Sequence, residues 1–121
     1  MTEQEKHLLL VDICSRLPYH TKIDTGVQGI STLDSNWYEI NRINLKYNSD
    51  ALLPYLRSIS SLTEEEQTQL GRLIGAASYN MLKGDYSSLR ELLEHVYKNH
   101  IDLFGLIPMG LALEAPKEMY T

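Results

Sequence analysis

The chain has 121 residues, of which 43% are hydrophobic and 22% are charged, so we expect a single soluble domain over residues 1–121. Its one cysteine excludes an internal disulfide and any metal site built from several thiolates. Eleven Lys and Arg stand against sixteen Asp and Glu, which gives a net charge of -5. Because no basic cluster appears, direct binding to nucleic acid is not expected.

The first segment has the pattern of a helix. Thr2 and Glu5 form a capping-box signature. Apolar positions then recur at the spacing of one helix face: Leu10, Ile13, Cys14 and Leu17. The sequence therefore predicts a helix that ends before Pro18, with Cys14 on its buried face as a core thiol.

Residues 19–47 have the alternation typical of strands. Tyr19, Thr21 and Ile23 alternate with polar residues, as do Tyr38 and Ile40. Turn-forming residues interrupt the pattern: Gly26, Gly29, Asp34, Ser35 and Asn36. We predict three or four short antiparallel strands here, followed over residues 48–61 by a packed connection.

A helical hairpin follows. Thr63 and Glu66 repeat the capping box, and residues 83–85 combine a stop, a turn and an N-cap. The predicted core face of the first hairpin helix is Leu70, Leu73, Ile74, Ala77 and Met81. The second hairpin helix, which we expect to end near Asn99, carries Leu89, Leu92, Leu93, Val96 and Tyr97.

Gly71 and Gly75 form a stripe of small residues on the first hairpin helix, which lets another group approach its backbone. Two interpretations stand. The second hairpin helix or the terminal segment packs there, or the stripe borders a shallow ligand groove. In the second case, Tyr55, Arg57 and His100 would supply its polar groups.

The segment Leu103–Leu113 contains no charged or polar side chain. Two glycines and a proline prevent a regular helix, so one interpretation is a loop or short strand folded back over the core. The alternative is an exposed interaction surface for a protein partner or a second copy of the chain. Its centre would be Leu106, Ile107, Pro108 and Met109.

No catalytic or metal-binding set emerges. The four histidines lack metal-ligand spacing, and His7 lies two helical turns, about 10 Å, from Cys14, which is too far for a Cys–His pair. We therefore expect no catalytic residues, no metal and no cofactor. The longest uncharged apolar run is far shorter than the roughly 20 residues of a spanning helix, and the first residues do not form a secretory signal. These features predict no secretory signal and no membrane contact.

Three strings resemble a group of small uncharacterised proteins from gut Bacteroides and from phages and mobile elements of that lineage. They are residues 9–19 (LLVDICSRLPY), residues 53–66 (LPYLRSISSLTEEE), and residues 99–102 leading into 105–112 (GLIPMGLA). Where that group usually has Lys-Pro before Tyr-Leu and a second Pro after Arg, this chain has Leu53 and Ser58. The resemblance covers roughly a third of the residues. It implies a cytoplasmic bacterial or phage setting, and it implies no activity, catalytic residue or cofactor.

Together these features predict an α+β domain with an N-terminal helix, a small antiparallel sheet of three or four strands, a helical hairpin and an apolar tail. The leading functional hypothesis is a non-enzymatic accessory or protein-interaction domain. The alternative is a ligand-binding protein or small enzyme that uses the groove beside Gly71 and Gly75. A third hypothesis is an indirect role near nucleic acid, through a DNA-binding partner or as an acidic mimic of the phosphate backbone.

Overall fold

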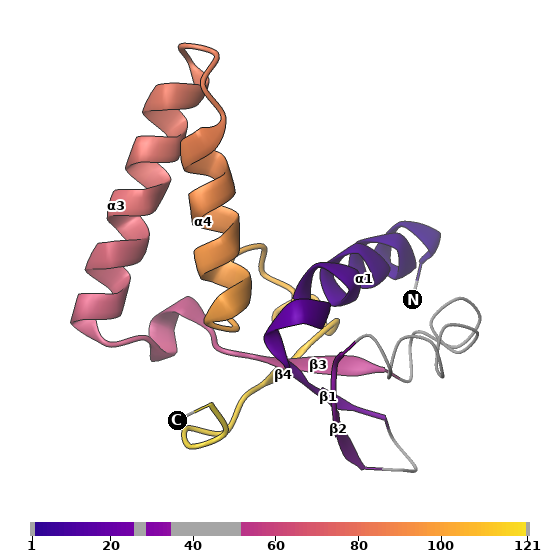
Figure 1. Ribbon diagram of the computed structural model, residues 1–121. Helices are drawn as coiled ribbons and strands as arrows, with labels where there is room; N and C mark the ends of the chain where they lie inside the picture. Colours follow the sequence, from indigo (N-terminus) through magenta and orange to yellow (C-terminus); the bar gives the residue numbers. More distant parts are fainter. Residues whose placement is uncertain (1, 26–28, 35–51, 121) are drawn as a thin grey trace.

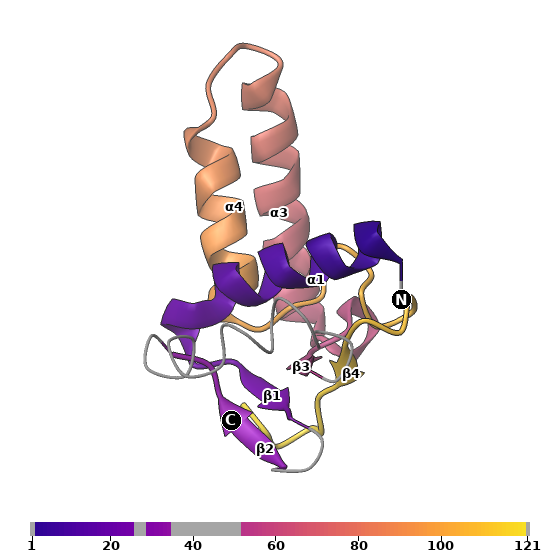
Figure 2. The same ribbon diagram turned by 90° about the vertical axis from the view of Figure 1, so that its right-hand side faces the viewer.

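The computed structural model describes residues 2–25, 29–34 and 52–120 and has an α+β architecture (Figure 1). The elements are α1 (Glu3–Arg16), η1 (Leu17–Tyr19), β1 (Lys22–Asp24), β2 (Ile30–Thr32), β3 (Leu53–Leu56), η4 (Ile59–Ser61), α3 (Glu64–Met81), α4 (Ser87–Lys98) and β4 (Leu113–Glu114). Helix α1 lies across one face of the sheet, and α3 and α4 project from the molecule as a hairpin (Figures 1 and 2). None of the helices described is long and apolar enough to cross a membrane.

The predicted start and end of the first helix are confirmed. The Thr2 hydroxyl accepts a hydrogen bond from the Glu5 backbone N–H at 3.1 Å, and the Glu5 carboxylate accepts one from the Thr2 N–H at 2.8 Å. Helix α1 ends at Arg16, and Pro18 lies in the single turn of η1. The reciprocal cap satisfies two of the N–H groups that a helix start leaves unpaired.

The predicted buried face of α1 is confirmed in part. Ile13 is buried and Leu10 and Leu17 pack against the core, but Cys14 is exposed, so its prediction as a core thiol is wrong. The fully buried residues are Leu9, Asp12, Ile13 and Arg16, and because two of them carry charges, the centre of the buried face is not the most apolar stripe. Partial burial of the Cys14 thiol still raises its pKa, which keeps the sulfur protonated at neutral pH.

The sheet has the order β2-β1-β3-β4. Strand β1 is antiparallel to β2, as predicted, and also to β3, whereas β3 and β4 are parallel. The parallel pair arises because the whole helical hairpin lies between these two strands, and a long crossover of this kind is what parallel pairing requires. The predicted strand at Tyr38 and Ile40 and the turn positions Gly26, Ser35 and Asn36 lie outside the described residues.

Strand β3 occupies the segment that we expected to be a packed connection. Pro54 favoured that interpretation because a proline cannot donate to a strand ladder. Strand β1 pairs with Leu53 and Pro54, and β4 pairs with Tyr55 and Leu56, so each half of β3 has one strand partner. A proline is compatible with such a strand because, among the described residues, Pro54 has a strand neighbour on one side only.

The hairpin begins as predicted. The Thr63 hydroxyl accepts from the Glu66 N–H at 3.2 Å, and the Glu66 carboxylate accepts from the Thr63 N–H at 3.1 Å. Leu70 and Ala77 are buried on α3, whereas Ile74 and Met81, both predicted in its core face, are 38% and 39% exposed. Among the described helices only α4 covers α3 extensively, so the buried stripe of α3 is narrower than its apolar face.

Three small clusters make up the described core. One lies between α1 and the sheet and contains Leu9, Ile13, Ile23, Leu33 and Leu52. A second joins the hairpin to its base and contains Leu62, Leu70, Ala77, Leu92, Val96 and Ile101. The third holds Leu56 with the tail residues Leu106, Leu111 and Ala112. The apolar tail therefore folds back onto the core, while Phe104 and Met109 stay exposed.

Candidate functional site

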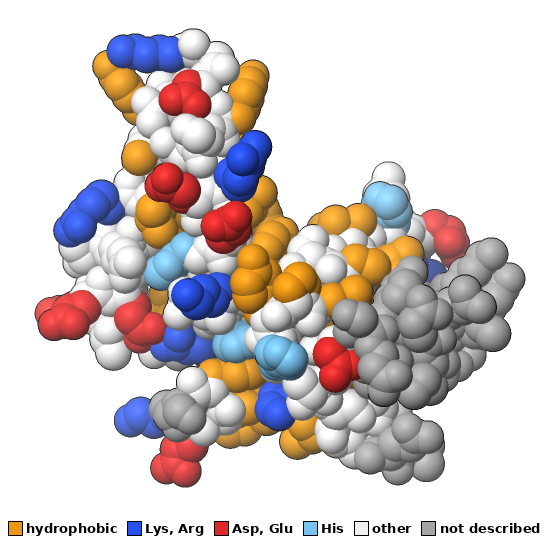
Figure 3. Space-filling model, in the orientation of Figure 1, with side chains coloured by type: hydrophobic (Ala, Val, Ile, Leu, Met, Phe, Trp, Pro, Cys, Tyr) orange, Lys and Arg blue, Asp and Glu red, His pale blue; other side chains and the backbone are white. Residues whose placement is uncertain are grey.

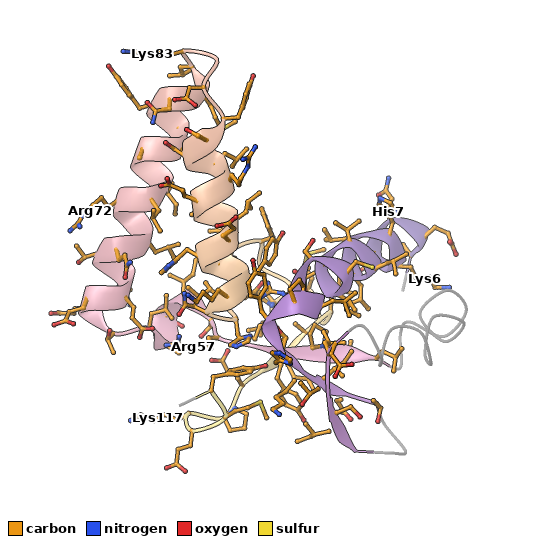
Figure 4. All side chains as sticks on the ribbon, viewed as in Figure 1. Lys6, His7, Arg57, Arg72, Lys83 and Lys117 are labelled. Atoms are coloured by element: carbon orange, nitrogen blue, oxygen red, sulfur yellow. The ribbon has the colours of Figure 1, made fainter. Side chains whose placement is uncertain are left out.

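A polar hollow of about 670 Å³ lies at the base of the hairpin, within the size range of pockets for small molecules. Its charged and hydrogen-bonding lining includes Arg57, Glu66, Asn99, Glu114, Lys117 and Tyr120. Figure 4 shows Arg57 beneath the hairpin and Lys117 on the tail below it. The hollow thus brings together three parts of the chain that are distant in sequence.

Arg57 is fixed by its backbone. Its N–H donates to the His100 carbonyl at 2.7 Å, and its carbonyl accepts from the Asp102 N–H at 2.9 Å. The guanidinium Nη2 lies 2.6 Å from Glu66 Oε2, and Nη1 donates to the Asn99 carbonyl at 3.4 Å. Hydrogen bonding from the Thr63 backbone, with a further contribution from Arg57, lowers the pKa of Glu66, so this pair is ionised.

Glu114 lies on the other side of the hollow. It is opposite Leu56 in the parallel register, and its Oε1 accepts from the Ser58 hydroxyl at 2.9 Å. Arg57 lies between Leu56 and Ser58 in the sequence. The bond to Ser58, which follows Arg57 in the chain, therefore holds a carboxylate in the wall of the hollow.

Behind the hollow, the last turn of the chain is attached to the sheet through Tyr120. Its hydroxyl donates to the Tyr55 carbonyl at 2.7 Å and accepts from the Lys22 N–H at 2.8 Å. Its ring stacks on His100 with centroids 3.7 Å apart, and His100 Nδ1 lies 2.9 Å from the Thr21 hydroxyl oxygen. Burial raises the pKa of Tyr120 to about 12, so its hydroxyl stays protonated and donates.

His100 has a strained backbone, with a φ of 59° directly after α4. The Ile101 N–H donates to the Val96 carbonyl and the His100 N–H to the Tyr97 carbonyl, which is the pattern of a Schellman cap. Glycine is favoured at this position, and a side chain there costs about 1 kcal/mol. The stack on Tyr120 and the contact with Thr21 offset that cost.

His100 is neutral at physiological pH. Burial, reinforced by the cations Arg16, Arg57 and Lys22, lowers its pKa to about 4. Because the unfolded chain binds this proton at a higher pH than the folded chain, the stabilisation is complete above about pH 6.5 and is lost as the pH falls towards 4. The ring therefore acts here as an uncharged stacking and hydrogen-bonding group.

We expect wild-type protein to lose about 1–2 kcal/mol more stability between pH 7 and pH 4.5 than His100→Asn, after allowance for solvent contact of the half-buried ring. Asparagine tolerates the left-handed backbone but does not titrate in this range. Urea unfolding of both proteins at several pH values measures the difference. Parallel pH profiles would contradict a depressed histidine pKa.

A second feature is a buried ion pair under the base of α4. Arg16 Nε donates to Asp12 Oδ2 at 2.8 Å, and Arg16 Nη2 donates to the Ile101 carbonyl at 2.9 Å. The guanidinium carbon lies 5.0 Å from the centre of the Tyr97 ring, and Nη1 is buried with no hydrogen-bond partner. These contacts join α1 to α4 and hold Tyr97 in place.

The third feature is an apolar groove of about 460 Å³ between α4 and the end of α1, which we call the α4 groove. Its apolar and aromatic lining is Pro18, Tyr19, Tyr86, Leu89, Leu93 and Tyr97, with Arg90 and Glu94 also in its wall. Figure 3 shows hydrophobic side chains where the hairpin meets α1. Leu92 and Val96 are buried in the hairpin core, while Leu89 and Tyr97 pack against that core with only part of their surface. The apolar stripe of α4 is therefore wider than the hairpin core covers, and its outer part lines the groove.

The sequence-predicted groove residues divide into two sets. Arg57 lines the polar hollow, while Tyr55 and His100 hold Tyr120, which lines it too. Gly71 and Gly75 line neither the hollow nor the α4 groove. A methyl group added at either glycine would meet no atom within 4 Å, so neither the second hairpin helix nor the tail approaches their backbone.

The sequence analysis missed several residues that belong to these three features. Glu114 and Tyr120 join the hollow only through the folded tail, which local patterns do not place. Asp12 and Arg16 have i, i+4 spacing, which is also typical of an ordinary surface pair. Their position between apolar residues of α1 was the available clue.

Across the described parts of the chain, no three His, Cys, Asp or Glu side chains gather as metal ligands would. Comparison of the chain with protein-family models, curated proteins and solved structures found no match. Functional interpretation therefore depends on the three features above.

Proposed function

We propose that this protein is a non-enzymatic interaction domain whose α4 groove binds an amphipathic helix of a different protein. The observation that carries the proposal is the outer part of the apolar stripe of α4, which lines this groove. Tyr86, Leu89, Leu93 and Tyr97 follow one another at i, i+3, i+7 and i+11 along about 16 Å of the helix. A face of this length matches the anchor spacing of a helix docked in a groove.

The chemistry of the groove favours a helix as the occupant. Its longer wall is α4, whose backbone N–H and C=O groups are bonded within the helix, so an added β-strand would find no backbone partners along that wall. Recognition must therefore use side chains. Arg90 and Glu94 provide one charge of each sign for polar residues beside the partner's apolar stripe.

A different protein is favoured over a second copy of this chain. A two-fold dimer places the same patch of both copies together, and two concave grooves facing each other would leave a void. The shape of the groove requires a convex partner. A helix with three or four apolar anchors has that shape.

The tail is a weaker interaction surface than the sequence suggested. Leu106 is only 1% exposed and Ile107 is half-buried, so two of the four expected surface residues contribute to the protein's own fold. Met109 and Phe104 are exposed but belong to a loop that is anchored at Asp102. We therefore place the interaction at the α4 groove.

We further propose, from the resemblance noted above, a cytoplasmic setting in a bacterium or its phages and mobile elements. The net charge of -5 supports a protein partner over direct contact with nucleic acid. No enzymatic activity is proposed.

Photo-cross-linking in the native host tests the groove. A photo-reactive phenylalanine analogue replaces Leu93 in the groove or, as a control, Arg72, which points outward from α3 (Figure 4). We expect position 93 alone to capture one protein, with the cross-link in a segment whose apolar residues follow i, i+3, i+4 and i+7. Equal capture at both positions, or capture of a second copy of this chain, would contradict the proposal.

Point variants give an independent test with the captured segment as a synthetic peptide. Tyr86→Ser changes a side chain that is 61% exposed, so the fold should tolerate it. We expect at least about 10-fold weaker binding for Tyr86→Ser, since aromatic residues at such positions often contribute more than 1 kcal/mol. Tyr79→Ser changes a tyrosine that is 60% exposed and lies outside the groove, and it should leave binding unchanged.

A further inference from the structure

We propose that the polar hollow at the base of the hairpin binds a small zwitterion, a compound with a carboxylate and an ammonium group close together, such as a free amino acid. The proposal stands on a different site from the α4 groove and does not depend on it. It starts from two opposite charges, Arg57 and Glu114, which line the same hollow.

Arg57 has donors to spare. A guanidinium carries five N–H groups, and in the described part of the chain only Glu66 and the Asn99 carbonyl accept from it, the latter at a long 3.4 Å. The side chain is 25% exposed, so its remaining edge is accessible from the hollow. The planar fork of N–H groups that Glu66 holds in place suits a bidentate carboxylate.

Glu114 supplies the opposite charge. Ser58 occupies its Oε1, while its Oε2 accepts from none of the described residues, and Glu114 itself is exposed. The carboxylate is thus available to an ammonium group. Glu114 is bonded to Ser58, the residue after Arg57, and both charges line the same hollow, so one ligand that carries both charges can reach them.

The remaining lining argues against a ligand with one sign of charge. A simple anion would face the carboxylates of Glu66 and Glu114, and a simple cation would face Arg57 and Lys117. A zwitterion satisfies both. Ala115 and Pro116 form an apolar part of the wall, and the volume of about 670 Å³ leaves room there for a side chain.

Calorimetric titration with blocked analogues tests the charge requirement. The probes are L-alanine, L-leucine and L-phenylalanine, each also as its N-acetyl and its amide derivative, up to about 20 mM. We expect at least one free amino acid to bind and both of its blocked forms to bind at least about 10-fold more weakly. Absence of binding by all three parents, or equal binding by a blocked form, would overturn the proposal.

Charge-removing variants locate the site. Arg57→Met and Glu114→Gln should each weaken binding at least about 10-fold, because each removes a charged hydrogen-bond partner. Arg72→Met and Glu91→Gln are matched controls on exposed helix positions outside the hollow, and they should leave amino-acid binding unchanged. Glu114→Gln alters an exposed side chain, so thermal unfolding should show an intact fold. Equal binding by Glu114→Gln and Glu91→Gln would place the ligand elsewhere.

Discussion

Replacing Arg16 with methionine is expected to destabilise the fold by about 3–5 kcal/mol, because it leaves the Asp12 carboxylate buried without its cation. Asp12 is 4% exposed, and burial already raises its pKa even with Arg16 present. The change also removes the bond to the Ile101 carbonyl and the contact with the Tyr97 ring. Urea unfolding monitored by circular dichroism measures the loss.

The dependence of this deficit on pH distinguishes a charge effect from a packing defect. Without Arg16 the folded-state pKa of Asp12 should lie further above its unfolded value. Stability is then retained at low pH and lost as the pH rises through the folded pKa. The deficit of Arg16→Met relative to wild type should therefore be smaller at pH 4.5 than at pH 7. A deficit independent of pH would indicate lost packing.

Two further proteins complete the comparison. Arg16 Nη1 is buried without a partner, so the wild-type pair already bears a desolvation cost. We therefore expect the double variant Asp12→Ala/Arg16→Met to regain most of the stability that Arg16→Met loses.

Lys6 provides the matched control, because it forms a 3.5 Å surface pair with Glu3 on the same helix. Lys6→Met should change the free energy of unfolding by less than about 0.5 kcal/mol.

The same ion pair shows what could be predicted from the sequence. Capping boxes are local, so Thr2 and Thr63 were placed correctly from four-residue patterns. The burial of Asp12 and Arg16 on α1 was missed, and Cys14 was wrongly placed in the core, because patterns of apolar residues do not register a charged pair in a core. Burial of Asp12 and Arg16 depends on Ile101 and Tyr97, which lie about 85 residues further along the chain.

The candidate sites follow the same division. Arg57 and His100 were singled out as polar groups of a groove beside Gly71 and Gly75, but they lie at or directly behind the polar hollow, which neither glycine lines. Their partners Glu114 and Tyr120 are brought there by the parallel β3–β4 pair, which is a long-range contact. The α4 groove was not predicted because its residues were assigned to the hairpin core. The apolar stripe of α4 is wider than the hairpin core covers, and the amino-acid pattern does not say which part of it a partner helix will cover.

Asp102 anchors the apolar tail, and its removal is expected to have the second-largest effect. Its Oδ1 accepts from the Leu106 N–H at 2.8 Å and its Oδ2 from the Ile107 N–H at 2.9 Å, and the residue is 5% exposed. Asp102→Ala leaves both donors without that partner, one of them in the buried residue Leu106. The expected loss is about 2–4 kcal/mol, because bonds to a charged acceptor are worth about 1.5–3 kcal/mol each and combine incompletely.

Asp102→Asn should lie between wild type and Asp102→Ala, because an amide has one acceptor oxygen and presents an N–H to the second donor. Asp85 provides the control: it is exposed and caps the start of α4 by accepting from the Ser87 N–H, so Asp85→Ala should lose only about 1 kcal/mol. Denaturant unfolding measures the stability of the three variants and so their order.

Cleavage by chymotrypsin reports on the loop itself. An opened tail exposes the peptide bond after Phe104, so Asp102→Ala should be cleaved there faster than Asp85→Ala. Equal cleavage and equal stability of those two variants would mean that Asp102 does not hold the tail on the core.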